Sequence, residues 1–506
     1  MNLKYTGLIR IMIVGMASIA QLVLLAVLVI MLRQNYVYLY VALEITGLVE
    51  VLFLANKDQS SAYTIAWIIV ILILPVFGIV IYLMWGRTPT HSRKSKRTRE
   101  IVMQRANHFD KNKEVRKKLE QEFPDRKKIV RFLENEGFPI YRNTVCKFYQ
   151  LGEFKFRDMI HDMKQAKRFI FIEYFIINEG ILWSMIYEVL REKAKEGVEV
   201  RILYDDLGSI ITLPKDFIRQ LENDGIKVTA FNPVHRYISR FYINFRNHQK
   251  IVVIDGNIGY TGGANLADEY ANLYEKHGHW KDTAIRLEGD AVWSLTVTFL
   301  QMWQSENLVE EDYSKYKPAG ESGGDGFYQP FSDSPVHSKN IAKIMYRQII
   351  TSAKKYVYIT TPYLVIDDSM INELCFAALT GTDVRIIVPK VYDKWYVYKV
   401  TCSNYRRLLE EGVRIYEYTP GYMHAKIIIS DDDNAIVGSI NMDYRSFYLH
   451  FENGVWICGS SVIRDIKEDI LKTLNQCKEI KLDEWEKRPW YKKASELFFR
   501  IFAPLL

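Results

Sequence analysis

Two long stretches near the N-terminus of this 506-residue chain contain no charged side chain, namely residues 11–32 and 59–86. At the rise of an α-helix, about 20 apolar residues cross the roughly 30 Å hydrocarbon core of a membrane. Both stretches are therefore predicted to be transmembrane helices. A cleaved signal peptide is disfavoured for the first stretch, because the apolar run of a signal peptide is usually shorter than residues 11–32. Residues 37–54 are apolar but contain Glu44 and Glu50. They are predicted to form a third crossing, with a re-entrant segment or an interfacial helix as alternatives.

A basic cluster directly follows the second apolar stretch. Its members are Arg87, Arg93, Lys94, Lys96, Arg97 and Arg99. Lys and Arg beside a transmembrane helix are retained on the cytoplasmic side, and they attract anionic headgroups. The alternative is a solvated linker without topological meaning. We predict a transmembrane region at residues 1–86 and a basic, charged linker at 87–130. The protein is expected to be a multi-pass protein of the cell membrane with its other domains in the cytoplasm.

Short apolar runs alternate with amphipathic stretches from about residue 130 onward. Residues 169–177 read FIFIEYFII, an amphipathic helix is predicted up to Glu196, and residues 198–204 read VEVRILY. Strand, helix and strand at this spacing are typical of βαβ units. The expected fold class is α/β, with mixed, mainly parallel sheets flanked by helices.

The same order of segments returns in the second half of the chain, at offsets of 187, 184 and 187 residues. The repeated pairs are 354–363 with 167–175, 381–388 with 197–204, and 412–416 with 225–229. This spacing indicates duplication of a domain-sized unit, since solenoid repeats have periods of about 20–50 residues. The Gly-, Ser- and Asp-rich residues 319–333 mark the join. We predict two pseudo-symmetric domains at 131–318 and 319–480, and an amphipathic tail at 481–506.

Each half contains one copy of the same polar constellation. In the first copy, residues 248–255 read HQKIVVID and residues 262–265 read GGAN. In the second copy, residues 424–431 read HAKIIISD and residues 438–441 read GSIN. A lone His-x-Lys on a strand is usually a surface feature, but a chance recurrence of six fixed positions is negligible. The constellation therefore indicates a functional site.

The spacing of these residues has a physical meaning. Side chains two residues apart lie on the same face of a strand, so His248 adjoins Lys250 and His424 adjoins Lys426. An imidazole, an ammonium and an amide that converge on one point suit a tetrahedral anion such as phosphate. Phosphoryl transfer through a covalent intermediate needs two such imidazoles, a nucleophile and an acid. The candidate phosphate-binding residues after the motifs are Asn265, Asn441, Gly263 and Ser439.

These paired segments resemble the HKD motifs of the phospholipase D superfamily. Further stretches resemble its bacterial cardiolipin synthase branch, and they are residues 171–177, 247–256, 258–265 and 441–447. The resemblance covers nearly the whole chain, and Ser439 replaces the second Gly of the motif. It implies two phospholipase D-like domains and a phosphatidyltransferase that joins two phosphatidylglycerol molecules into cardiolipin and releases glycerol. No cofactor or metal is implied, and no nucleic acid partner.

The resemblance also implies roles for the motif residues. One His attacks the phosphorus and the other protonates the leaving glycerol, and we assign His248 as the nucleophile and His424 as the acid and base. The sequence itself does not distinguish the two. Lys250 and Lys426 would hold the phosphoryl oxygens and stabilise the transition state, together with the two Asn residues.

Four acidic residues accompany the motifs. Asp255 and Asp431 complete the two copies, but each falls at a strand end, where a structural salt bridge or turn is favoured over direct catalysis. A nucleophilic His also needs a partner that fixes its tautomer. Asp282 and Glu452 occupy equivalent positions, since each is followed seven residues later by a Gly. We predict that Asp282 orients His248 and Glu452 orients His424, with Glu275 as the runner-up in the first copy.

Composition excludes few alternatives. The formal charge of +7 is too small to indicate nucleic-acid binding, and the five scattered cysteines fit a reducing compartment. They are Cys146, Cys375, Cys402, Cys458 and Cys477. His277 and His279 lack the acids or thiols of a metal site, so they are interpreted as loop or headgroup contacts.

Rival functions remain open at this point. A phospholipase D hydrolase would use the same His pair with water, and a superfamily nuclease would need more basic residues along a groove. A membrane-anchored lipid-binding scaffold predicts a broken motif, and both copies are complete. The tail mixes aromatic and basic residues, which is typical of an interfacial helix or, equally, of a packed helix at the domain edge.

Overall fold

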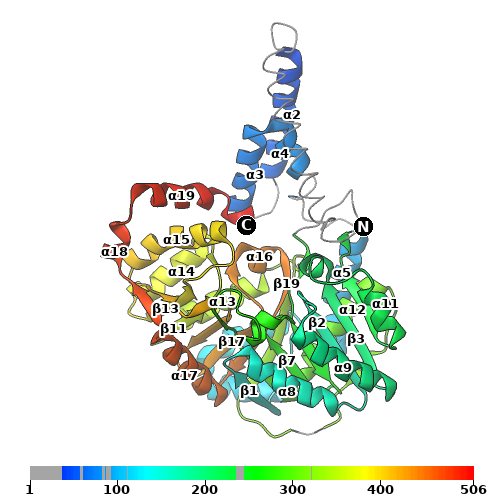
Figure 1. The fold of residues 1–506 in the computed structure, drawn as a ribbon. Coiled ribbons are helices and arrows are strands. Elements are labelled where there is room, and N and C mark those ends of the chain that lie inside the picture. The colour runs from blue at the N-terminus through cyan, green and yellow to red at the C-terminus, as the bar shows by residue number, and fades with distance from the viewer. Residues whose placement is uncertain are drawn as a thin grey trace.

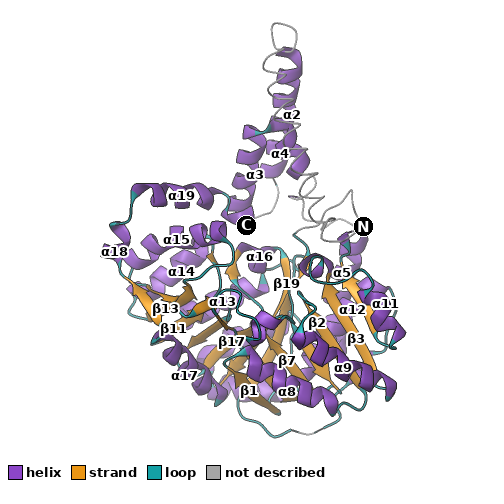
Figure 2. Cartoon of the chain, in the orientation of Figure 1, coloured by secondary structure: helices purple, strands orange, loops and turns teal. Residues whose placement is uncertain are grey.

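Two β-sheets with flanking helices make up the body of the protein, and a small group of N-terminal helices stands on one side of it (Figure 1). The computed structural model describes residues 37–56, 61–82, 86, 93–110, 112–234, 244–320 and 322–505. In the body the strands lie inside and the helices outside (Figure 2). The predicted α/β class is confirmed.

The first sheet has the strand order β1-β9-β7-β6-β2-β3-β4. Its strands are β1 (Thr144–Tyr149), β2 (Phe169–Tyr174), β3 (Glu199–Asp205), β4 (Lys227–Phe231), β6 (Ile251–Ile254), β7 (Ile258–Gly262) and β9 (Ala284–Gly289). The helices of this half are α8 (Gly152–Lys164), α9 (Ile181–Lys195), α10 (Asp206–Ser209), α11 (Phe217–Asn223), η5 (Asp268–Ala271), α12 (Val292–Asn307) and η6 (Tyr313–Tyr316).

The second sheet repeats this order as β10-β19-β17-β16-β11-β13-β14 and adds β20 at its edge. Its strands are β10 (Phe327–Asp333), β11 (Tyr356–Thr360), β13 (Asp383–Pro389), β14 (Arg414–Tyr418), β16 (Ile427–Ser430), β17 (Asn434–Gly438), β19 (His450–Cys458) and β20 (Cys477–Ile480). A separate pair joins β12 (Leu364–Val365) to β18 (Met442–Asp443). The helices of this half are α13 (Ile341–Ser352), α14 (Asp368–Leu379), α15 (Trp395–Glu410), α16 (Tyr444–Tyr448) and α17 (Val462–Leu474).

Antiparallel pairings outnumber parallel ones among the described strands of both sheets, so the expectation of mainly parallel sheets is wrong. The pairs β2–β3 and β3–β4 are parallel, because helices carry the chain back across the sheet. The pairs β2–β6, β6–β7, β7–β9 and β1–β9 are antiparallel. In the tight turn between β6 and β7, Asp255 and Gly256 have φ values of 54° and 76°. Such turns make hairpins, which the strand–helix–strand pattern did not predict.

The two halves share a hydrophobic core. Alternate residues of β6 face opposite sides of the sheet, so Val252 packs within the first half while Val253 packs in a cluster that both halves build. That shared cluster also contains Leu295 of α12 and Val437 of β17. Each fully buried side chain of this size contributes about 1.5–3 kcal/mol, so the shared core fixes one half on the other.

The segment expected to be a basic linker is folded in its described part. It forms α5 (Arg93–Met103), η2 (Gln104–His108), α6 (Lys113–Glu122), η3 (Pro124–Arg126) and α7 (Lys127–Asn135). Leu119, Ile129 and Leu133 are fully buried in the core of the second half, together with Phe327 and Ile341. These residues therefore belong to the body of the second half, although they precede the first half in sequence.

The apolar N-terminal region is described only in part. Residues 1–36, which hold the first predicted transmembrane stretch, lie outside the described residues. The later part forms α2 (Val37–Ala55), α3 (Ser61–Ile73) and α4 (Pro75–Ile81), and Pro75 interrupts the second predicted stretch. Among the described residues, none of the helices combines the length and the apolar character needed to span a membrane. The predicted transmembrane helices are therefore not confirmed.

The C-terminal tail forms α18 (Leu482–Glu486), α19 (Trp490–Ile501) and η7 (Ala503–Leu505). On one edge of α19, Phe499 packs against Trp395 of α15 with ring centroids 5.1 Å apart. Large apolar side chains on α19 remain exposed, and they are Trp490, Tyr491, Leu497, Phe498 and Ile501. The tail is thus attached to the second half by one edge and leaves an apolar face open.

Candidate active site

The two motif segments lie at the junction of the halves, and each is hydrogen-bonded to a strand of the opposite half. Just before the first motif, β5 (Arg246–Asn247) pairs in parallel with the start of β19 in the second half. Just before the second motif, β15 (Gly421–Met423) pairs in parallel with β8 (His279–Lys281) of the first half. The backbone N–H of His248 also donates to Phe451 O at 2.9 Å, and that of His424 to Lys281 O at 2.8 Å.

The pairing of each motif segment with a strand of the opposite half determines the partner of each imidazole. His248 Nδ1 lies 2.9 Å from Glu452 Oε1, and His424 Nδ1 lies 2.6 Å from Asp282 Oδ2. The predicted carboxylates are therefore the contacts of the two rings, but the predicted pairing within each half is wrong. The physical reason is that Glu452 lies on β19 and Asp282 directly follows β8, the strands to which the opposite motif segments are bonded.

Both carboxylates are held by further donors. Ser446 Oγ donates to Glu452 Oε1 at 2.7 Å, and Ser439 Oγ donates to the other oxygen of Glu452. The backbone N–H of Thr283 donates to Asp282 Oδ1 at 2.8 Å. A ring that donates its Nδ1–H to a fixed carboxylate keeps an unprotonated Nε2 on its other side. Each ring can therefore present a lone pair to an electrophile.

The two lysines complete the cluster. Lys250 Nζ donates to the carbonyl oxygen of His248 at 2.6 Å, and Lys426 Nζ donates to that of His424. The charge of Lys426 lowers the pKa of Lys250. The charges of Asp282 and Glu452 act on both lysines in the opposite direction. The charged groups of both halves therefore form one site.

Burial shifts the pKa of these groups strongly. It lowers the pKa of His248 well below its usual value, with Lys250 acting in the same direction, and lowers that of His424 to about 4. It also lowers the pKa of Lys426 to about 8 and raises that of Glu452, although the charge of Lys250 and the hydrogen bonds from Ser439 and Ser446 act in the opposite direction. Removal from water disfavours each charged form, so both imidazoles are neutral near pH 7 when no ligand is bound.

The candidate phosphate-binding residues are partly engaged within the protein. Asn265 accepts from Ile176 N and donates to Tyr270 OH, while Asn441 donates to Asp443. Each amide nitrogen has a second hydrogen, so a contact with phosphate stays a prediction.

The backbones of the small residues Gly263 and Ser439 are engaged within the protein, and their assignment as phosphate ligands stays a prediction. Their backbone N–H groups donate within the protein, to Thr283 O at 3.0 Å and Asn453 O at 2.9 Å. A Cβ at Gly263 would lie 2.2 Å from Asp282 Oδ1 and 3.0 Å from Lys426 Cδ. Glycine is needed here because groups from both halves pass close to its backbone.

The motif aspartates have structural contacts, as favoured from the sequence, and do not touch the rings. Asp255 accepts hydrogen bonds from the backbone N–H groups of Lys167 and Arg168 at 2.8 and 2.7 Å. Asp431 repeats this contact with Lys354 N at 2.8 Å and also binds Arg126 at 3.3 Å. Both aspartates therefore tie the end of a motif strand to the start of its neighbour.

Aromatic residues that the sequence analysis did not single out surround the rings. Tyr270, Trp280 and Tyr422 have ring centroids 5.2, 5.6 and 5.7 Å from that of His424. Phe175 and His450 have ring centroids 5.1 and 5.7 Å from that of His248. For Trp280, Tyr422 and His450, the sequence signal was a position two residues before Asp282, His424 and Glu452.

One group among the described residues has ligand atoms close enough to hold a metal ion. His248, His450 and Glu452 have ligand atoms within 4.8 Å of one another. As the side chains stand, Glu452 accepts hydrogen bonds from His248 and two serines, so the group is a hydrogen-bonded network. His277 and His279 were interpreted from the sequence as loop or headgroup contacts. His279 contacts Tyr418 OH at 3.1 Å through Nδ1, and the His277 ring is 6.2 Å from that of Trp280.

Comparison with known proteins identifies the family of this chain. The family described as "Cardiolipin synthase, PLD-like domain" matches residues 159–303 and 346–474, and "Phospholipase_D-nuclease N-terminal" matches residues 42–87. Cardiolipin synthase 2 of Bacillus cereus is 36% identical over 460 residues, which cover 90% of this chain and 89% of the relative. Cardiolipin synthase of Halalkalibacterium halodurans is 34% identical, with 90% of this chain and 91% of the relative covered.

A solved structure shares the fold. Phosphatidylserine synthase of Haemophilus influenzae superposes with a TM-score of 0.57 at 15% identity, covering 74% of this chain and 97% of that one.

The duplicated α/β fold and its crossed pair of His-x-Lys segments define a protein of the phospholipase D superfamily. Within that superfamily, the sequence matches show that the chain belongs to the cardiolipin synthase family, a group of phosphatidyltransferases.

Proposed function

We propose that this protein transfers a phosphatidyl group from one phosphatidylglycerol to another, which yields cardiolipin and glycerol. The observation that carries the proposal is that both halves of the chain build one site. Two imidazoles, each held at Nδ1 by a carboxylate of the opposite half, share one cluster with two lysines. This arrangement supplies a nucleophile, an acid and two cations for a single phosphodiester.

In the first step, Nε2 of His248 attacks phosphorus and forms a P–N bond, while the P–O bond to glycerol breaks. His424 gives its Nε2 proton to the departing oxygen. His424 has a low pKa in the empty site because it is buried and lies beside Lys426. The bound phosphodiester anion supplies the opposite charge, so it raises the pKa of His424 and favours the protonated acid.

In the second step, a hydroxyl of the second phosphatidylglycerol attacks the phosphatidyl-histidine. Its proton passes to Nε2 of His424, the P–N bond breaks, and His248 recovers its lone pair. One P–O bond replaces another in the whole reaction, so no nucleotide is consumed. Lys250 and Lys426 stabilise the charge that develops on the phosphoryl oxygens in both steps.

Product analysis tests this function. The full-length protein is incubated with vesicles of phosphatidylglycerol labelled in its headgroup and in its acyl chains. Equal amounts of cardiolipin and free glycerol are expected. Phosphatidic acid with glycerol would instead support the hydrolase, and label in a different phospholipid would support another headgroup acceptor.

The pH dependence provides a prediction for Lys426. Because burial lowers its pKa to about 8, the ammonium loses its proton above that pH and no longer attracts the phosphoryl oxygens. We expect kcat/KM to fall by about 10-fold per pH unit on the alkaline side. Lys426→Arg keeps its charge throughout this range, so its residual activity should lack the decline. A decline at the same pH in the Arg variant would assign it to another group.

Association with a membrane is also part of the proposal, with the body on the cytoplasmic side. The open face of α19 supports it, since Trp490 is 78% and Phe498 57% exposed. Phe499 on its packed edge and Ala62 at the start of α3 join one cluster with Ala503. The tail therefore lies beside the apolar N-terminal helices, so both can meet the same lipid surface.

An environment-sensitive fluorophore tests the contact of α19 with lipid. The dye is attached to Phe498→Cys and, as a control, to Met185→Cys on α9, which is 49% exposed in the wild type. α9 lies on the opposite side of the body from the N-terminal helices (Figure 1). In vesicles, we expect blue-shifted emission at position 498 and water-like emission at position 185. Water-like emission at both positions would contradict a membrane-facing tail.

A further inference from the structure

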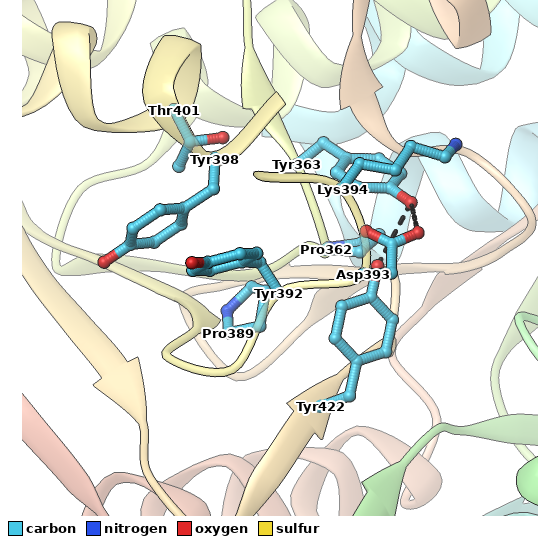
Figure 3. A pocket seen from close by; sticks show the side chains of 9 residues that line it. All are labelled: Pro362, Tyr363, Pro389, Tyr392, Asp393, Lys394, Tyr398, Thr401 and Tyr422. Carbon is cyan, nitrogen blue, oxygen red and sulfur yellow. Dashed lines mark hydrogen bonds between the residues drawn. The ribbon is translucent and has the colours of Figure 1, made fainter. Parts of the chain in front are cut away.

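A small pocket opens at the carboxyl end of β13, beside the site of His424. Its walls come from the residues after β11 and β13, from α15 and from β15 (Figure 3). The lining residues are Pro362, Tyr363, Pro389, Tyr392, Asp393, Lys394, Tyr398, Thr401 and Tyr422. The catalytic scheme above uses none of them.

Asp393 is the acidic residue of this lining. Tyr363 OH donates to Asp393 Oδ2 at 2.6 Å, and Tyr422 OH donates to Tyr363 OH at 3.1 Å. Figure 3 shows the two phenol hydroxyls converging on one side of the carboxylate. The other oxygen, Oδ1 of Asp393, is buried without a hydrogen-bond partner among the described residues. A buried acceptor of this kind is costly unless a ligand or water donates to it.

The pocket adjoins the catalytic cluster, because Tyr422 contacts both. The Tyr422 ring lines the pocket and lies 5.7 Å from the His424 ring, centroid to centroid. The charge of Asp393 also acts on Lys426 and on Tyr270, whose ring is 5.2 Å from that of His424. A group bound at Asp393 would therefore lie on the side of the acid and base.

The charges of the two sides differ. Near His248, the cations Arg445, Lys250 and Arg246, together with Lys394 of the pocket lining, act on His450, which favours anionic phosphate on that side. In the pocket, the carboxylate of Asp393 repels phosphate but can accept a hydrogen bond from an uncharged alcohol. Lys394, the cation of the lining, is exposed and lies over the Tyr363 ring at 5.4 Å.

We propose that Asp393, supported by Tyr363 and Tyr422, binds a glycerol hydroxyl that does not itself react. It would bind this hydroxyl both on the glycerol that leaves the donor and on the headgroup of the incoming acceptor. This inference rests on the proposed transferase function and adds the residue that selects an alcohol over water. It also places the alcohol beside His424, which fits His424 as acid and base and His248 as nucleophile.

Competition between acceptors tests Asp393. Acyl-labelled phosphatidylglycerol vesicles are incubated with the full-length protein, and cardiolipin and phosphatidic acid are counted in each reaction. Both products come from the same covalent intermediate, so their ratio reports only the choice of acceptor. We expect Asp393→Ala to lower the ratio of cardiolipin to phosphatidic acid about 10-fold or more, because a hydrogen bond to a charged group is lost. Tyr363→Phe should lower it less.

Asp216→Asn is the matched control, since Asp216 is exposed and makes no capping hydrogen bond. Thermal unfolding shows whether each variant is folded. An Asp393 variant that is folded and keeps the wild-type ratio overturns the inference but leaves the transferase intact. An equal fall in the Asp216 variant also overturns it. A wild-type protein that makes no cardiolipin overturns the proposed function, and the inference with it.

Discussion

His248→Asn is expected to lower phosphatidyl transfer by about 10³-fold or more, and His424→Asn by a similar factor, because one variant lacks the nucleophile and the other the acid and base. A substrate with a good leaving group separates the two roles. An activated phosphatidyl ester, such as a nitrophenyl ester, needs no protonation of its leaving group. His424→Asn should therefore release nitrophenol in a burst, whereas His248→Asn should release none.

The burst must equal the amount of enzyme, because the phosphatidyl-histidine cannot turn over without a base. Trapping with acid and mapping the labelled peptide would place the phosphatidyl group on His248. Label on His424 in the wild type would reverse the assignment of nucleophile and acid while leaving the shared site intact. Full turnover in both variants would contradict the catalytic role of the pair.

Glu452→Gln is expected to lower transfer by about 10²-fold or more, because the amide cannot balance a charged ring or hold its tautomer as the carboxylate does. The crossed contacts make the effect specific. Glu452 contacts His248 at 2.9 Å and Asp282 contacts His424 at 2.6 Å. The Glu452 variant should therefore slow the burst from the activated ester, whereas Asp282→Asn should leave the burst and slow only the steps that need the acid or base.

Asp255→Asn is a useful control for these variants, since Asp255 closes a turn and contacts backbone N–H groups away from the rings. It should reduce stability more than catalysis by folded enzyme. If Asp282→Asn abolished the burst and Glu452→Gln preserved it, the side chains would act within their own halves, contrary to the contacts seen here.

Much of the fold followed from the repeat. Because equivalent segments recur at nearly constant offsets, the two sheets and the two motif strands could be placed in corresponding positions. The direction of the strands was harder to predict. Strand β6 pairs antiparallel with β2, and apolar runs such as residues 251–254 read alike in parallel and antiparallel sheets.

The partner of each imidazole could not be derived from equivalence. A repeat shows that Asp282 and Glu452 occupy the same place in their halves, but contacts within and between halves satisfy that symmetry equally. Only the pairing of β5 with β19 and of β15 with β8 decides between them. Such short strands join segments far apart in sequence, and they carry no periodic pattern of their own.

Two other features had a signal that was not used. On α7, Ile129, Val130 and Leu133 follow helical spacing, which indicates a buried face in a segment otherwise rich in Lys and Glu. Asp393 lies four residues after the last residue of β13, at the carboxyl edge where α/β sheets bind ligands. The buried face of α7 was missed because the segment is highly charged overall. Asp393 was missed because it belongs to no repeated motif.

The exchange of strands between the halves has a consequence for how this enzyme could specialise. Each imidazole takes its supporting acid from the opposite half, so a complete site needs both halves. Two identical subunits would be forced to use the same acid twice. A single polypeptide with two copies is free of that constraint. Here one ring is hydrogen-bonded to an aspartate and the other to a glutamate. The proposed reaction has two unequal half-steps, and the two different acids give it an asymmetric pair of catalysts.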